Sequence, residues 1–276
     1  MPQEKRFPIN AHEADCLQKF ALATRRQFMF LPEKPARHWY PGAGIGVAFR
    51  RDPKPNDVFA VQETCSTETH GSTAAGWTLC PDGLSEKSIV YSLGVGEDIS
   101  FDLSLIAKYG ATVHAFDPTP ESINWIRQQS LPDRFHFHEL AVSDTDGTSS
   151  LYPPGNADHV SHSLLETRRG KGPSIRVSTR RLSTLMQELG HSSIDVLKMD
   201  IEGSENDVIE DMLQSTVDVR QLLVEFHHRF RLVGIEKTKV ALRSLQRHGY
   251  GLFAISPNGE EFSFLKGGTR QCNGGV

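Results

Sequence analysis

The feature that most restricts the fold is an alternation of short apolar runs with segments of helical periodicity, which starts at residue 88. The apolar runs predict strands at 89–93, 112–116, 135–142, 175–178, 194–199 and 221–226. The segments of helical spacing predict helices at 99–109, 120–129, 182–189, 205–213 and 236–248. Strands that alternate with helices form a mostly parallel sheet covered on both faces. The sequence therefore predicts an α/β fold.

The two ends of the chain depart from this alternation. Segments 250–256 and 261–265 flank Pro257-Asn258-Gly259 and predict a C-terminal hairpin that adds an antiparallel element at one sheet edge. The N-terminal part predicts a helical and loop-rich cap, with a helix at 11–28, strands at 45–49 and 58–61, and a mobile loop at 64–75. The predicted organisation is a cap at 1–87 and a sheet domain at 88–276.

The composition excludes several classes of protein. The chain has 30 Lys and Arg against 34 Asp and Glu, and this net charge of −4 gives no general attraction to nucleic acid or an anionic membrane. The four cysteines form no C-x-x-C pair, which favours free thiols in a reducing compartment. No apolar run approaches the length of about 20 residues that spans a bilayer, and the first residues lack a signal-peptide core. We therefore expect a cytoplasmic protein.

Polar and glycine residues follow the predicted strands, and ligands of such sheets bind at the carboxyl ends of the strands. Gly94 and Gly96 follow the first strand and let the backbone approach a ligand. Glu97 and Asp98 would repel a phosphate at the start of the next helix and favour a cationic ligand such as S-adenosylmethionine. Asp117 has the spacing of an acid that accepts hydrogen bonds from ribose hydroxyls. The alternatives are first-turn acids that complement a helix dipole and a turn-forming Asp before proline.

Four motifs in this region resemble those of the FkbM family of methyltransferases that use S-adenosylmethionine. They are Leu93-Gly94-Val95-Gly96-Glu97-Asp98, Ala115-Phe116-Asp117-Pro118-Thr119-Pro120, Leu140-Ala141-Val142-Ser143-Asp144 and Leu197-Lys198-Met199-Asp200-Ile201-Glu202-Gly203-Ser204-Glu205. Upstream, Gly76-Trp77-Thr78-Leu79-Cys80-Pro81 and Ser100-Phe101-Asp102 resemble a methyltransferase-like branch of that family. The family commonly has Asp where this chain has Ser92, so we expect Glu97 and Asp98 to help hold the aminocarboxyl end of the cofactor.

The resemblance implies a class I methyltransferase fold, a Rossmann-like sheet, and methyl transfer to a hydroxyl oxygen of a sugar or natural product. It places S-adenosylmethionine against Gly94, Gly96, Asp117 and the turn that starts at Ala141 and Val142. It also places Asp200 and Glu202 beside the reacting centre. The expected acceptor is a small or carbohydrate-like molecule, with no nucleic acid or membrane partner.

Transfer to a hydroxyl requires positioning and a base that removes a proton. Asp200 and Glu202 end one predicted strand, and Glu225 and His227 end its neighbour with the same spacing of two residues. The sequence predicts His227 or Asp200 as the base and Glu202 beside them. The same four side chains could hold a divalent cation, but no metal site is predicted. The alternatives are helix capping by the acids and pairing of Glu225 with Arg229 or Arg231.

Two further segments are candidates for contact with the acceptor. His159 and His162 lie in a loop that could line an acceptor pocket or be exposed to solvent. A basic run could attract an anionic acceptor or form a solvated face; its members are Arg168, Arg169, Lys171, Arg176, Arg180 and Arg181. Two other functions stay open at this point. A nucleotide-dependent oxidoreductase would predict a full G-x-G-x-x-G, whose last position is Ile99 here, and a non-catalytic binding module would keep the sheet without turnover.

Overall fold

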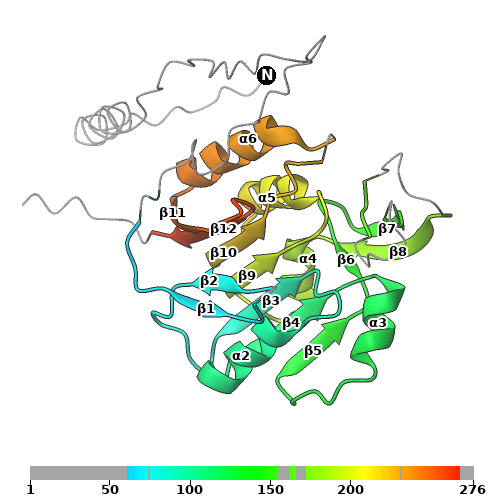
Figure 1. Cartoon of the computed structure of the whole chain (residues 1–276), viewed down its shortest axis with the longest axis horizontal. Helices are drawn as coiled ribbons and strands as arrows, with labels where there is room; N and C mark the ends of the chain where they lie inside the picture. The colour runs from blue at the N-terminus through cyan, green and yellow to red at the C-terminus, as the bar shows by residue number, and fades with distance from the viewer. Residues whose placement is uncertain are drawn as a thin grey trace, which may run out of the picture. The chain divides into compact units, whose positions relative to one another are not determined.

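The computed structural model describes residues 61, 63–73, 75–154, 162–165, 172–230 and 232–267 (Figure 1). The chain divides into two compact units at 1–51 and 52–276, and all described residues lie in the second unit. The helix expected at 11–28, the strand expected at 45–49, most of the strand expected at 58–61, and His159 lie outside the described residues. The same holds for Arg168, Arg169 and Lys171 of the basic run.

A seven-stranded sheet organises the described part of the chain, in the order β11-β12-β10-β9-β3-β4-β5. Its strands are β3 (Ile89–Leu93), β4 (Thr112–Phe116), β5 (Phe135–His138), β9 (Ile194–Met199), β10 (Val219–Glu225), β11 (Tyr250–Ile255) and β12 (Glu261–Lys266). Neighbours from β5 to β10 pair in parallel, and β12 pairs antiparallel with both β10 and β11. This topology confirms the expected class I methyltransferase sheet with an antiparallel C-terminal hairpin.

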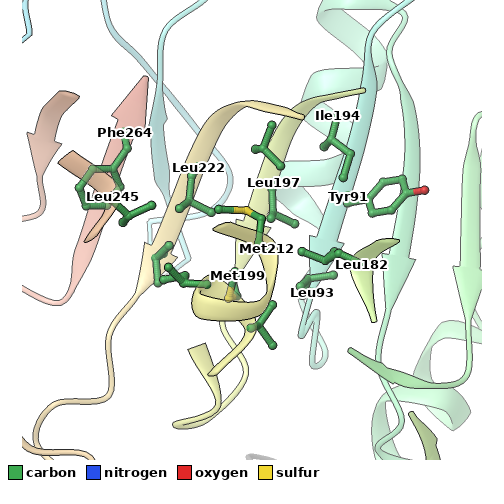
Figure 2. Close-up of a cluster of buried hydrophobic side chains, with 14 of the residues drawn as sticks. Tyr91, Leu93, Leu182, Ile194, Leu197, Met199, Met212, Leu222, Leu245 and Phe264 are labelled. Atoms are coloured by element: carbon green, nitrogen blue, oxygen red, sulfur yellow. The ribbon is translucent and has the colours of Figure 1, made fainter. Parts of the chain in front are cut away.

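Helices cover both faces of the sheet, because the central strands carry apolar side chains on both faces. They are α2 (Ser100–Tyr109), α3 (Pro120–Ile126), α4 (Leu182–Leu189), α5 (Glu205–Gln214) and α6 (Gly234–Arg247). One apolar cluster joins α4, α5 and α6 to side chains such as Tyr91 and Leu197 (Figure 2). A second cluster joins α2 and α3 to Val90 and Val113 on the opposite face. Because side chains alternate along a strand, Ser92 shares the α2 face with Val90.

The segment before the sheet differs from its expected form. β1 (Glu68–His70) pairs antiparallel with β2 (Trp77–Leu79), so the expectation of a mobile loop over 64–75 is wrong at 68–70. Helix α2 supplies hydrogen-bond partners for this polar segment, which the local sequence could not predict. Nδ1 of His70 lies 2.5 Å from Oγ of Ser104, and the Ser72 amide donates to Oγ of Ser100 over 2.7 Å. Trp77 is buried in the cluster on the α2 face, so this hairpin covers part of the sheet.

The strand expected at 135–142 is interrupted. β5 ends at His138, and β6 (Ala141–Val142) belongs to a separate three-stranded sheet of order β6-β8-β7. Its other members are β7 (Gly147–Leu151) and β8 (Ile175–Arg180). β7 has the sequence Gly-Thr-Ser-Ser-Leu, whose single apolar residue gives no alternating pattern, and it was not predicted. This small sheet brings Ala141 and Val142 to the edge of the cavity described next.

Candidate active site

A cavity of about 390 Å³ lies at the carboxyl ends of β3, β4 and β9. This is the switch point of the sheet, where the chain order moves from β3 to β4 on one side and β9 lies on the other. The volume falls within the range of about 300–1,000 Å³ typical of small-molecule pockets. Every residue expected to bind a cofactor lines it: Gly94, Gly96, Glu97, Asp98, Asp117, Ala141 and Val142. Asp200 and Glu202 line it as well.

The turn after β3 has a shape that requires glycine. Gly94 has φ 71°, and a Cβ at this position would lie 1.7 Å from the carbonyl oxygen of Asp200. Gly96 has φ 54° and faces open space, since a Cβ added there would have no neighbour within 4 Å among the described residues. Lys198 holds the turn from β9, because its Nζ donates to the carbonyl oxygen of Gly94 over 2.6 Å. Gly94 thus permits the close approach of the Asp200 backbone, and Gly96 leaves the backbone of the turn open to a ligand.

Asp117, at the end of β4, fixes the same turn. Its Oδ2 accepts hydrogen bonds from the amides of Val95 and Gly96 over 3.1 and 3.0 Å, and its Oδ1 accepts from the Thr119 amide over 2.8 Å. The side chain is buried yet borders the cavity. A carboxylate oxygen can accept more than one bond, so these contacts leave Asp117 able to accept from a ribose hydroxyl, a role that stays a prediction.

The two acids that follow the turn differ in their surroundings. Asp98 accepts from the Ser100 amide over 2.8 Å through Oδ1 and from the Ser72 hydroxyl over 2.7 Å through Oδ2. Burial raises the pKa of Asp98, but the hydrogen bonds from Ser100 and Ser72 outweigh it and the net pKa is lowered. Glu97 is exposed at the rim of the cavity. Asp98 therefore acts as an ionised acid at the start of α2.

A carboxylate cluster surrounds His227 just beyond the ends of β9 and β10. Its Nε2 lies 3.3 Å from Oε2 of Glu202, 3.7 Å from Oδ1 of Asp200 and 3.9 Å from Oε1 of Glu225. The structure thus brings together all four side chains that the strand ends placed side by side in sequence. Asp200 and Glu202 line the cavity, whereas His227 lies behind them and outside its lining.

Glu205, which the sequence analysis interpreted only as the start of a helix, completes the cluster. Its Oε1 lies 2.8 Å from Nδ1 of His227 and accepts hydrogen bonds from the amides of Gly203 and Ile201 over 2.9 and 3.3 Å. The side chain is fully buried. The position of Glu205 in the motif could have indicated this role. An acid at the first position of a helix that follows Gly-Ser can fold back and accept hydrogen bonds from the preceding turn.

The charges in the cluster shift the pKa values of its members. Burial lowers the pKa of His227, but the hydrogen bond and charge of Glu205, with the charges of Glu202 and Asp200, outweigh burial and raise this pKa to about 10. Burial raises the pKa of Asp200 to about 6. Burial and the charge of Asp200 raise the pKa of Glu225 to about 8. At neutral pH, His227 is a cation enclosed by acids.

The backbone at Glu202 is strained. Among the described residues, Glu202 is the one non-glycine residue with a positive φ, at 54°. Such conformations cost on the order of 1–3 kcal/mol and persist where neighbours hold them, as at functional sites. Here the Ser163 hydroxyl donates to the carbonyl oxygen of Glu202 over 2.6 Å. In this conformation Oε2 of Glu202 lies 3.3 Å from Nε2 of His227.

The structure also bears on the other interpretations. One ligand atom each from Asp200, Glu202 and His227 lies within 4.8 Å of the others, a spacing that could hold a divalent cation. Arg229 pairs with Glu260 and not with Glu225. His162 lines the cavity, 4.0 Å from a carboxylate oxygen of Glu121.

Two arginines of the basic run have acidic partners. Arg180 lies 3.3 Å from Glu188, and Arg181 pairs with Asp211. These pairs favour a structural role for the described end of the run. In the described part of the chain, no helix is both long and apolar enough to cross a membrane.

The chain is similar to known proteins over much of its length. "Probable methyltransferase-like protein 24" of Homo sapiens is 29% identical over 209 residues, which cover 69% of this chain and 50% of that protein. "2-O-methyltransferase NoeI" of Sinorhizobium fredii is 29% identical over 175 residues, which cover 58% of this chain and 71% of that protein. Among solved structures, the Methanococcus jannaschii fibrillarin pre-rRNA processing protein aligns with 67% of this chain and 69% of its own, at 9% identity and a TM-score of 0.41.

The extent of these matches differs. The chain spans about half the length of the methyltransferase-like protein 24 relatives. The sequence model of the methyltransferase FkbM domain matches residues 90–252, which is more than half of the chain and includes the parallel strands from β3 to β10 except Ile89, the glycine turn and the His227 cluster. The chain therefore belongs to the FkbM-domain methyltransferase family.

Proposed function

We propose that this protein transfers the methyl group of S-adenosylmethionine to a hydroxyl oxygen of a sugar or natural-product acceptor. One observation carries the proposal: a glycine turn with acids at its helix start borders the same cavity as Asp200 and Glu202, two carboxylates of the cluster around His227. The first feature suits a cationic cofactor and the second can remove a proton. Family membership supports methyl transfer, and the name of the NoeI relative supports an oxygen acceptor.

The residues at the glycine turn fit S-adenosylmethionine. Gly96 leaves open space where a side chain would otherwise begin, and the cavity has the volume of a small-molecule site. Glu97 and Asp98 would oppose the phosphates of a dinucleotide and suit a ligand with an ammonium and a sulfonium. When bound, this cofactor supplies an electrophilic methyl group. Gly94, Gly96, Glu97, Asp98, Asp117, Ala141 and Val142 would hold it.

Asp200 is the base in this proposal. It borders the cavity and so can receive the proton of an acceptor hydroxyl, whereas His227 lies behind the lining. His227 with a pKa near 10 carries protons on both ring nitrogens at neutral pH and has no lone pair to offer. Asp200 with a pKa of about 6 is mostly ionised there and close to the operating pH that favours general-base catalysis. Glu202 and His227 orient it.

Thermal shift of the full chain tests the cofactor assignment. S-adenosylmethionine and S-adenosylhomocysteine should raise the melting temperature, since a ligand that binds only the folded state stabilises it, and NADH should not. A rise with NADH alone would contradict the proposal and favour the oxidoreductase interpretation. Methyl transfer that is lost with EDTA and restored by Mg²⁺ would assign a cation to Asp200, Glu202 and His227 in place of a base.

A further inference from the structure

A buried carboxylate lies in the first turn of the helix that follows the glycine turn. Asp102, in the first turn of α2, is 1% exposed, and neither of its oxygens has a hydrogen-bond partner of acceptable geometry among the described residues. It nonetheless borders the cavity. Burial of an ionisable group without a well-formed hydrogen bond is destabilising, so such a group in a binding cavity points to a ligand.

The polar neighbours of Asp102 favour its ionised form but leave its oxygens without a well-formed hydrogen bond among the described residues. Burial raises its pKa to about 6, and the nearby Lys198 ammonium and Ser92 hydroxyl offset part of this rise. Within the described part of the chain, Asp102 forms no hydrogen bond of acceptable geometry with Lys198, whose Nζ donates to the Gly94 carbonyl oxygen. Ser92 stands in register with Lys198 on the neighbouring strand and is itself fully buried. A serine thus occupies the strand end, and the carboxylate comes from the helix.

The other acids near the turn are less suited to hold a buried cation. Both oxygens of Asp117 accept backbone hydrogen bonds, and both oxygens of Asp98 accept from Ser100 and Ser72. Glu97 is exposed, where water screens its charge. Asp102 therefore combines burial, contact with the cavity and free acceptor capacity.

We propose that Asp102 supplies the negative charge that holds the ammonium group at the methionine end of S-adenosylmethionine. Charge-assisted hydrogen bonds between ammonium and carboxylate are among the stronger polar interactions in proteins. They gain strength in a site that is shielded from water. The inference rests on the proposed function and adds the residue that selects the amino end of the cofactor. It revises the expectation that Glu97 and Asp98 carry this role.

The test compares two nucleosides on the full chain by isothermal titration calorimetry. S-adenosylhomocysteine carries the amino and carboxylate groups, whereas 5′-methylthioadenosine lacks both. Asp102→Asn should raise the dissociation constant of S-adenosylhomocysteine by about ten-fold or more. The dissociation constant of 5′-methylthioadenosine should stay within about two-fold of the wild-type value. Decarboxylated S-adenosylhomocysteine keeps the amine but lacks the carboxylate, and the same substitution should weaken its binding as well. Asp133→Asn, on an exposed loop, is the matched control for the loss of one charge.

A relocated charge gives a second arm. Ser92→Asp combined with Asp102→Asn should restore part of the lost affinity for S-adenosylhomocysteine, because it places a carboxylate on the strand next to position 102. Equal weakening of both nucleosides by Asp102→Asn would assign Asp102 a structural role and overturn the inference, as would unchanged binding of S-adenosylhomocysteine. Wild-type protein that is folded and binds neither nucleoside would instead contradict the proposed function.

Discussion

The Nδ1 atom of His227 lies 2.8 Å from Oε1 of Glu205, a carboxylate with no exposed surface. This contact fixes the imidazole so that its Nε2 faces Asp200 and Glu202. Because Glu205 also accepts two backbone amides of the turn after β9, one side chain sets both the turn and the ring. The cluster is therefore organised from a buried helix start.

Glu205→Gln should lower the pKa of His227 toward its ordinary value, because it removes the first charge that raises it. The amide oxygen of Gln can still accept from Gly203 and Ile201, so the turn should persist. We expect kcat to fall by about 10²-fold and the pH profile to shift. The pH dependence of the His227 ring signals in NMR reports the pKa directly. Glu210→Gln, exposed on the same helix, should change neither quantity.

Asp200→Asn should abolish the base and keep the cofactor site. We expect kcat to fall by about 10²–10⁴-fold, with the dissociation constant of S-adenosylhomocysteine within about three-fold of wild type. Single-turnover kinetics and calorimetry separate the two. Asp195→Asn, at the opposite end of β9, removes an acceptor of the Ile89 amide and should affect stability but not turnover. Full activity of Asp200→Asn would exclude Asp200 as the base.

The two glycines of the turn should differ in their tolerance of alanine. Gly96→Ala adds a methyl group in open space and incurs mainly the left-handed backbone penalty of about 1–2 kcal/mol. Gly94→Ala places that group against the Asp200 carbonyl oxygen and should lower the free energy of unfolding by more. Urea denaturation measures both, and equal losses would contradict the close approach of β3 and β9 at this point.

A group of neutral histidines on β4, β5 and the end of α4 should make the fold sensitive to acid. Burial and neighbouring histidines lower the pKa of His114 to about 3, and burial lowers those of His138 and His191. Nδ1 of His114 lies 3.0 Å from Nε2 of His138, and His191 bonds to the Tyr91 hydroxyl.

The direction of the effect follows from the lowered pKa values. Between pH 6.5 and about 3, the unfolded state binds more protons at His114 than the folded state does. The free energy of unfolding is therefore highest above pH 6.5 and falls as the pH drops through this window. The fall is at most about 1.4 kcal/mol per pH unit for His114. Urea midpoints at pH 7 and pH 5 measure it, and His114→Phe should reduce the difference. An equal difference in this variant would count against the assignment.

The sequence predicted those parts that depend on apolar periodicity. The bounds of β3, β4, β9 and α4 agree with the predicted ranges because each is a clear apolar or amphipathic run closed by a glycine or polar residue. The convergence of Asp200, Glu202, Glu225 and His227 also followed from the rule that parallel strands end at one edge. β1 and β7 were missed because their polar residues are satisfied by partners distant in sequence.

The roles of two buried acids could not be predicted for a related reason. Asp102 and Glu205 each lie in the first turn of a helix, where an acid is ordinarily interpreted as a complement to the helix dipole. Their burial depends on how α2 and α5 pack against the sheet, which the sequence does not reveal. Only the structure shows that both side chains face inward toward the site.

The central claim is that the cavity at the ends of β3, β4 and β9 binds S-adenosylmethionine. Isothermal titration calorimetry of the full chain with S-adenosylhomocysteine tests it most directly. One saturable site per chain is expected, where S-adenosylmethionine competes and where a folded Gly94→Ala variant binds more weakly. Absence of binding up to ligand concentrations on the order of 1 mM, by protein that unfolds cooperatively and is therefore folded, would contradict it.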